Sequence, residues 1–190
     1  MKQMKVPSGR HSEAYGKILQ YFFSFPQAET TLNQLALRVK ISKTSAQQAI
    51  RQLGEEKFLK KKIVGRSWLL SCNPQHWHNY SKKITYFLGE ILASDLLPQL
   101  NQNYPSSRAI ILFGSYRKGD STEHSDIDIA IEVLSLAKPK IIEFGFFPEL
   151  GYRKNVPITV HLFSRKDMNL NLFANIANGF VLDGFLEVRP

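Results

Sequence analysis

Residues 108–133 place the tightest limits on how this chain can fold. The run "RAIILF" has the continuous apolar character of a strand buried on both faces, and it leads directly into Gly114 and Ser115. In "SDIDIAIEV", strict alternation puts the isoleucines on one face of a strand and Asp126 and Asp128 on the other. Carboxylates in a buried strand are costly unless a partner compensates for their lost hydration. The stretch therefore predicts a sheet that carries a ligand site.

The junction between the first strand and the residues after it predicts a phosphate site. A helix that starts at Gly114 and Ser115 presents backbone N–H groups and the positive end of its dipole to an anion. Gly114 has no side chain to obstruct a phosphate, Ser115 can add a hydroxyl hydrogen bond, and Arg117 or Lys118 can neutralise the remaining charge. A serine at a helix start is more often an ordinary N-cap, so this junction alone is weak evidence.

The two aspartates predict a metal site. On one strand, Asp126 and Asp128 would lie about 7 Å apart at their Cα atoms. Two carboxylates so placed repel each other unless a cation lies between them. Hard carboxylate oxygens select Mg²⁺ or Mn²⁺.

Together these motifs resemble the minimal nucleotidyltransferases of the DNA polymerase β-like superfamily. The spacing is Gly114, Ser115, three residues, Gly119, five residues and then "SDID", and "LFANIANGFVLDGF" is similar to the last helix and the ending of that group. The resemblance covers about residues 80–190 and implies an α/β domain with a mixed sheet. It implies that Asp126 and Asp128 are catalytic and hold Mg²⁺ (or Mn²⁺) on an NTP, expected to be ATP. It implies nucleotide-binding roles for Gly114, Ser115, Arg117, Lys118, Gly119 and Ser125.

The resemblance also implies a reaction, transfer of a nucleotidyl group to a protein or RNA hydroxyl with pyrophosphate leaving. Active members supply a third carboxylate from a later strand, and "VPITVHLFS" is the candidate strand here. The corresponding position falls at Thr159 or His161, neither of which is acidic. His161 can act as a base, as a metal ligand or as a packed structural residue. The missing oxygen can also come from acids elsewhere, namely Glu143, Glu149 or Asp167.

The positive charge of the chain lies in its first half. Residues 1–90 carry 15 Lys and Arg against 5 Asp and Glu, whereas residues 91–190 carry 10 against 11. A basic half joined to a near-neutral half predicts two modules, one of which faces a polyanion. The alternative is that these lysines only keep a small domain soluble.

Residues 10–73 predict three helices followed by a basic hairpin. Apolar residues recur at helical spacing from Ser12 to Phe25, Thr31 caps a second helix, and Ser42 caps a third. "KKKIVGRSWLLS" then reads as two short strands about a turn. This order is that of a winged helix-turn-helix, and "LNQLALRVKISKTSAQQAIRQLGEEKFLKKK" is similar to bacterial and archaeal winged-helix regulators.

Winged helices of that group bind double-stranded DNA, although some serve as protein-interaction modules or bind RNA. The third helix turns donors and acceptors outward, on Lys43, Thr44, Gln47, Gln48 and Arg51. The resemblance implies base contacts from Thr44, Gln47, Gln48 and Arg51. It implies phosphate contacts from Lys60, Lys61, Lys62 and Arg66.

The sequence of residues 74–107 predicts a connecting helix that Pro98 kinks or ends. We expect the first helix of the second domain to fall within residues 80–102. His76 and His78 have no third ligand nearby in sequence, so we expect no metal there. Cys72 is the only cysteine, which excludes an intramolecular disulfide and predicts a buried thiol.

The predicted fold class is therefore α+β with two domains: a winged helix over residues 10–73, and a nucleotidyltransferase domain over 108–190 joined to it by the connector. The main hypothesis is a cytoplasmic DNA-binding nucleotidyltransferase of a toxin–antitoxin-like system, without a membrane segment. One alternative is a non-catalytic regulator whose degenerate transferase domain senses nucleotide, and another is a scaffold that binds neither ligand. A partner protein or RNA is expected as acceptor, and homodimerisation is common among winged helices.

Overall fold

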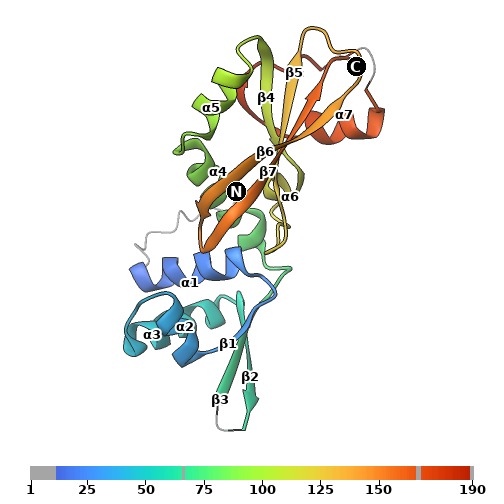
Figure 1. Ribbon diagram of the computed structural model, residues 1–190. Coiled ribbons are helices and arrows are strands. Elements are labelled where there is room, and N and C mark those ends of the chain that lie inside the picture. The colour runs from blue at the N-terminus through green and yellow to red at the C-terminus, as the bar shows by residue number, and fades with distance from the viewer. Residues whose placement is uncertain (1–11, 66, 166–167, 189–190) are drawn as a thin grey trace, which may run out of the picture. The chain divides into compact units, whose positions relative to one another are not determined.

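The computed structural model describes residues 12–188 except 66, 166 and 167. These residues form two compact units, the first made of residues up to Phe22 with Gln27–Asn73, and the second of Phe23–Pro26 with the chain from Pro74 onward (Figure 1). Both helices and strands are present, as the α+β prediction requires. Among the described helices, none is both long and apolar enough to cross a membrane.

The first unit combines three helices with a small antiparallel sheet, in the order β1-β3-β2. The predicted three helices and hairpin are present. Strand β1 was not predicted, because a strand of three residues is too short to show an alternating pattern. The elements are α1 (Glu13–Ser24), β1 (Glu29–Thr31), α2 (Leu32–Arg38), α3 (Lys43–Glu55), β2 (Leu59–Val64) and β3 (Ser67–Cys72).

Local capping fixes where two of these helices begin. The Thr31 hydroxyl accepts a hydrogen bond from the Gln34 backbone N–H, and the Gln34 side chain accepts one from the Thr31 N–H, which is a capping box. The Ser42 hydroxyl caps α3 in the same way. The apolar stripe of α3 is buried as predicted, and so is Cys72.

The second unit is built on a five-stranded mixed sheet in the order β6-β7-β5-β4-β8. Among the described strand pairs of this sheet, β5 and β7 run parallel and the others antiparallel. Turns and short helices connect the strands. The elements are η1 (Trp77–Tyr80), α4 (Lys82–Leu92), α5 (Leu96–Asn103), β4 (Ser107–Phe113), α6 (Gly114–Lys118), β5 (Ile127–Val133), β6 (Lys140–Leu150), β7 (Arg153–Phe163), α7 (Leu170–Ala177) and β8 (Phe180–Gly184).

Both faces of the central strands are buried. On one face Ile111 and Phe113 of β4 pack with Ala130 of β5 and Ile176 of α7. On the other face Leu112 and its neighbours are equally buried, and Figure 1 shows α4 and α5 on the side of the sheet opposite α7. A strand covered on both faces needs apolar residues at every position, which explains the continuous run "RAIILF".

The single long helix predicted after residue 74 is wrong, because the chain forms two helices, α4 and α5. The break lies at Ser94, whose hydroxyl donates to the Ile91 carbonyl and accepts from the Leu96 N–H. Pro98 was expected to kink or end the helix, yet it lies in the first turn of α5. Backbone N–H groups there have no partner within the helix, so proline costs no hydrogen bond. These helices belong to the second unit.

Candidate functional site

Glycines bound the short helix that follows β4. Gly114, its first residue, has φ +71°, and Gly119, its C-cap, has φ +82°. Both values lie in the left-handed region, where a side chain is disfavoured. A Cβ at position 119 would lie 2.2 Å from the carbonyl oxygen of Asn79, so backbone from η1 also approaches closely here.

Gly114 lies directly against the carboxylate of Asp128. Strands β4 and β5 pair antiparallel with Phe113 opposite Asp128, which brings the next residue to that side chain. A Cβ at position 114 would lie 2.2 Å from Asp128 Oδ2 and 3.0 Å from its Cγ. The structure therefore brings together the two predicted halves of the site, the Gly-Ser turn and the aspartate pair.

Asp126 and Asp128 lie at the start of β5. Asp126 directly precedes the strand, which begins at Ile127 and therefore later than the alternation predicted, and its side chain is half-buried. The Asp128 side chain is 29% exposed, so solvent reaches it. Glu132 on the same strand is 1% exposed and pairs with Arg165 at 2.6 Å, which makes it a structural acid and not part of this site.

His161 lies beside Asp128. Strand β7 pairs parallel with β5, so Thr159 stands opposite Asp128, and His161 stands opposite Ala130. His161 Nε2 is 3.6 Å from Asp128 Oδ1, and the imidazole packs edge-on against the Phe113 ring. Both ring nitrogens are buried, and neither has a hydrogen-bond partner among the described residues. The His161 side chain of β7 therefore lies beside the Asp128 carboxylate.

The acids proposed as substitutes for the third carboxylate lie elsewhere. Glu143 is exposed on the edge strand β6 opposite Thr159, two strands from Asp128 and therefore about 10 Å away. Glu149 stands opposite Lys154 in the β6–β7 strand register, close to the turn between these strands. Asp167 lies outside the described residues.

The other predicted nucleotide-binding residues differ in their surroundings. Ser115 is partly exposed at the helix start, and Lys118 is exposed. The Arg117 guanidinium lies over the Phe180 ring, 5.7 Å from its centroid. The Ser125 hydroxyl accepts the Thr122 backbone N–H at 2.9 Å, so it closes the turn that leads to Asp126.

Two buried basic side chains, neither predicted from the sequence, bind the loop between α6 and β5. Arg153 donates to the Ser125 carbonyl at 2.7 Å and to the Tyr116 hydroxyl. Burial raises the pKa of Tyr116 to about 12, Arg153 opposes the rise, and the charge of Asp126 adds to it. Lys83, 2% exposed on α4, donates to the Ser121 carbonyl at 2.5 Å. Single charged residues in otherwise ordinary segments give no sequence signal of such contacts.

A divalent metal ion fits the chemistry of these residues. Carboxylates of Asp126 and Asp128 are suitable oxygen ligands, and the absence of a Cβ at Gly114 keeps the Asp128 carboxylate accessible from the turn. The described residues contain no group of three or more His, Cys, Asp and Glu side chains arranged to hold a metal ion. Nucleotide phosphates and water would supply additional oxygen ligands.

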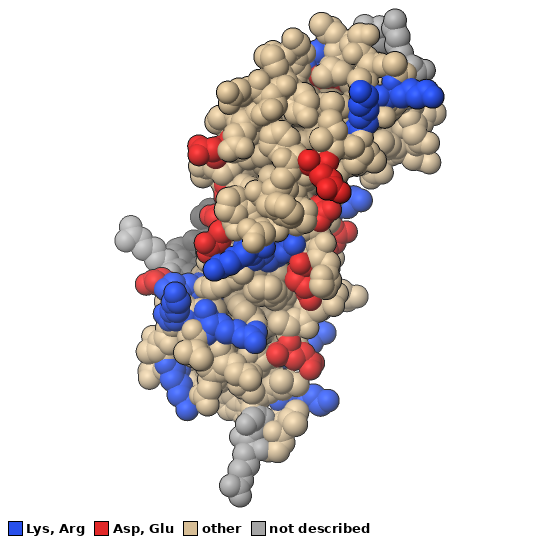
Figure 2. Space-filling model, viewed as in Figure 1, with Lys and Arg blue, Asp and Glu red and all other residues tan. Residues whose placement is uncertain are grey.

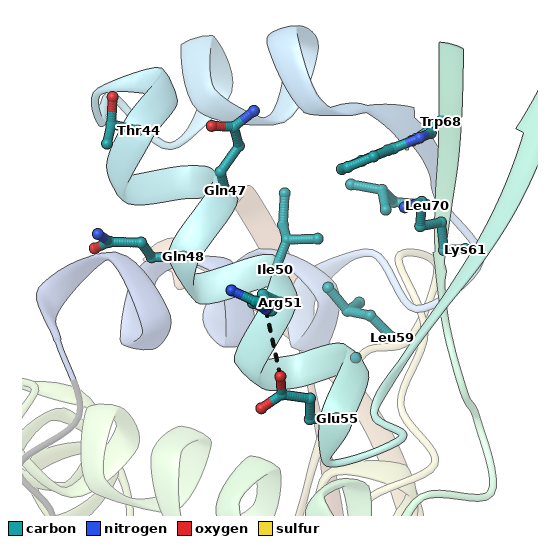
Figure 3. Close-up of a pocket in the computed structure, with 11 residues that line it drawn as sticks. Thr44, Gln47, Gln48, Ile50, Arg51, Glu55, Leu59, Lys61, Trp68 and Leu70 are labelled. Atoms are coloured by element: carbon teal, nitrogen blue, oxygen red, sulfur yellow. Dashed lines mark ion pairs between the residues drawn. The ribbon is translucent and has the colours of Figure 1, made fainter. Parts of the chain in front are cut away.

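In the first unit, α3 and the hairpin form the candidate nucleic-acid interface. The predicted residues Lys43, Thr44, Gln47, Gln48 and Arg51 are all exposed on α3. A cavity of about 760 Å³ lies between α3 and the hairpin. Figure 3 shows its polar rim on α3, with Trp68 across the opening.

The hairpin lysines lie on two faces. Strand alternation places Lys61 on the cavity side with Leu59, and Lys60 and Lys62 on the opposite side. Lys61 Nζ lies 3.0 Å from the centroid of the Trp68 ring, a cation–π contact. The single cluster of lysines predicted from sequence is therefore divided, and Arg66 lies outside the described residues.

Charge alone does not mark this interface. On the face shown in Figure 2, the Lys and Arg side chains of the first unit lie in separate groups with acidic residues between them. Arg51 itself pairs with Glu55 at 3.5 Å, an exposed contact drawn in Figure 3. The arrangement of hydrogen-bonding side chains on α3 therefore defines the candidate interface better than net charge does.

The comparison with known proteins concerns the second unit. A family model described as a nucleotidyltransferase domain matches residues 93–162. This match includes the Gly114–Ser115 turn, Asp126, Asp128 and His161, and it supports placing this part of the chain in the nucleotidyltransferase superfamily. It also supports a nucleotidyl-transfer function in general terms, and domains of this kind generally use a divalent metal and an NTP. No curated protein matches the chain.

Proposed function

We propose that the second unit binds an NTP with a divalent cation, and transfers its nucleotidyl group to a hydroxyl of a protein or RNA. The observation that carries this proposal is the contact between Gly114 and the Asp128 carboxylate. Phosphate-binding backbone and metal-binding acid meet at one point, as a metal–nucleotide complex requires. The family match over residues 93–162 supports the same reaction class.

In this proposal some residues of the site bind the nucleotide and the cation, and others keep the site in position. The N–H groups at the start of α6 and the Ser115 hydroxyl face the phosphates, with Arg117 and Lys118 in the same turn as sources of positive charge. Asp126 and Asp128 would hold the cation, whose charge would offset that of the phosphates and of the pyrophosphate leaving group. Arg153 keeps the Asp126 loop fixed relative to α6. Fixed geometry of this kind lowers the entropic part of the barrier.

A label-transfer experiment tests this function. The full chain is incubated with Mg²⁺ and each α-³²P-labelled NTP in a lysate, and label is sought on protein and on RNA. We expect label in the wild type and none with Asp126→Asn/Asp128→Asn, because amides are much weaker cation ligands than carboxylates. Calorimetric titration of Mg-ATP should show nucleotide binding to the wild type and not to the double variant. Unchanged affinity in the double variant would refute the metal site.

The same measurements separate the enzyme from the nucleotide-sensing regulator. A sensor predicts Mg-ATP binding that depends on Asp126 and Asp128, with no label on any acceptor. The regulator alternative rests on the missing third carboxylate, since neither Thr159 nor His161 is acidic. Binding without transfer would therefore favour the regulator over the enzyme.

We further propose that the first unit binds double-stranded DNA. The exposed polar side chains along α3 support this function, because Gln and Arg pair with base edges in the major groove. Thr44, Gln47, Gln48 and Arg51 would read bases, and lysines of the hairpin would contact phosphates. Anisotropy of labelled duplexes at several salt concentrations tests the proposal. Affinity for duplex that does not fall as salt rises would contradict it.

A further inference from the structure

The distance between His161 and Asp128 is informative in itself. At 3.6 Å, Nε2 and Oδ1 are too far apart for a hydrogen bond, whose usual N···O distance is about 2.7–3.2 Å. Two ligand atoms that each lie about 2.1 Å from one tetrahedral ion are about 3.4 Å apart. The observed separation is close to this tetrahedral value and longer than the roughly 3.0 Å between adjacent ligands of an octahedral ion, so a small closing shift would let both atoms bind one cation.

The burial of the imidazole supports the same interpretation. Both ring nitrogens are buried, and neither bonds to any group within the described part of the chain. Buried polar atoms are nearly always paired, because a buried unpaired nitrogen costs free energy. The Phe113 ring, 5.0 Å away between centroids, packs edge-on against the imidazole and helps to fix its orientation.

We propose that His161 is a metal ligand together with Asp128, and that this nitrogen ligand changes the cation preference of the site. The inference rests on the proposed nucleotide-binding function of the second unit. Mg²⁺ prefers oxygen ligands, whereas imidazole suits first-row transition metals better. The site then prefers Mn²⁺, Co²⁺ or Zn²⁺ over Mg²⁺ in complex with the nucleotide. The position expected to hold a third carboxylate is used for metal selection.

Electron paramagnetic resonance of Mn²⁺ tests the ligand directly. Mn²⁺ and α,β-methylene-ATP, which prevents transfer, are added to the wild-type chain. Electron spin echo modulation should show a ¹⁴N nucleus bound to Mn²⁺. Protein labelled with ¹⁵N-histidine is the matched control, since its spectrum must change to the ¹⁵N pattern, whereas nitrogen from the adenine ring would not change.

Variants then test the preference. Calorimetry measures the affinities of the Mg²⁺ and Mn²⁺ complexes of α,β-methylene-ATP for the wild type, His161→Asp and His161→Ala. We expect His161→Asp to reduce the preference for Mn²⁺ over Mg²⁺ by about tenfold or more, the size typical of changes around a metal site. His124→Asp, which introduces the same acid at an exposed histidine of the same unit, should leave the preference unchanged.

The outcomes separate the two proposals. If neither metal–nucleotide complex binds the folded wild type, the proposed nucleotide-binding function fails. If a complex binds but the ¹⁵N label leaves the spectrum unchanged, only the histidine-ligand inference fails. The histidine-ligand inference also fails if the ratio of the affinities of the Mn²⁺ and Mg²⁺ complexes is the same in the wild type, His161→Asp and His161→Ala. Because the spectroscopic test uses the wild type, it holds even if a variant does not fold.

Discussion

Gly114 is the residue on which the geometry of the site depends most. Its φ of +71° and its close approach to Asp128 leave no room for a side chain. We expect Gly114→Ala to cost about 1–2 kcal/mol in backbone strain. The added methyl group must also displace the Asp128 carboxylate, so Mg-ATP affinity should fall further than stability does. Chemical denaturation and calorimetric titration measure the two effects.

Gly89→Ala is the matched control for this substitution. Gly89 lies in α4 of the same unit, and a Cβ there would meet nothing within 4 Å. Alanine in a helix interior is more stable than glycine by about 0.5–1 kcal/mol, so this variant should be slightly stabilised and bind nucleotide normally. Equal nucleotide affinity in the two variants would show that the approach of Gly114 to Asp128 does not matter for binding.

Sequence alone could predict the Gly-Ser turn and the two aspartates, because their spacing is local and follows strand alternation. It left the third position open between Thr159 and His161. The register puts Thr159 opposite Asp128, yet the His161 side chain is the one found 3.6 Å from the carboxylate, and both facts depend on long-range packing. Arg153 and Lys83 could not be found at all, because their partners, Ser125 and Ser121, are distant in sequence.

At the scale of elements, the alternation of β2 gives its lysines different environments. Lys61 shares the cavity face with the α3 residues, while Lys60 and Lys62 point the other way. If the hairpin binds DNA, Lys60→Ala/Lys61→Ala/Lys62→Ala should weaken binding to all duplexes. The slope of log affinity against log salt should become smaller by about 0.9 for each phosphate that the variant no longer neutralises. Anisotropy titrations from low to moderate salt measure this slope.

The matched control removes the same charge elsewhere. Lys138, Lys140 and Lys154 are exposed in the second unit, and their triple replacement by alanine should leave the salt slope unchanged. Comparing Lys61→Ala with Lys60→Ala/Lys62→Ala then shows which face of the hairpin meets phosphate. If the hairpin triple variant and the control triple variant bind alike, the hairpin does not touch DNA.

Element types were more predictable than element ends. The helices of the first unit follow from visible caps at Thr31 and Ser42. The break between α4 and α5 was not predicted, because Ser94 acts through hydrogen bonds that only the folded chain shows. Pro98 was misinterpreted as the interruption because its effect depends on where in a helix it lies.

At the scale of the molecule, the two compact units should respond to different ligands. Hydrogen exchange of the full chain can locate each response. Mg-ATP should slow exchange in α6 and at the start of β5, where backbone amides would bind phosphate or lie beside the cation. A duplex should slow exchange in α3 and in the β2–β3 hairpin.

The experiment carries its own control, because each ligand reports on the unit that the other should not protect. If Mg-ATP slows hydrogen exchange in α3 but not in α6, the assignment of nucleotide binding to the second unit is contradicted. Equal protection of both units by duplex would contradict the assignment of DNA to the first. Polyanionic heparin, added in place of duplex, distinguishes general charge binding from recognition of a double helix.

The place of His161 in the sheet has an evolutionary consequence. Codons for aspartate and histidine differ only in their first base, so one mutation exchanges a carboxylate for an imidazole at this position. His161 lies on a central strand whose pairing with β5 depends on backbone and not on that side chain. The backbone pairing of β7 with β5 is thus compatible with either residue at this position. With His161 acting as proposed, a lineage that replaces aspartate by histidine would depend less on abundant Mg²⁺ and more on scarcer transition metals. Its activity would then follow the supply of those metals.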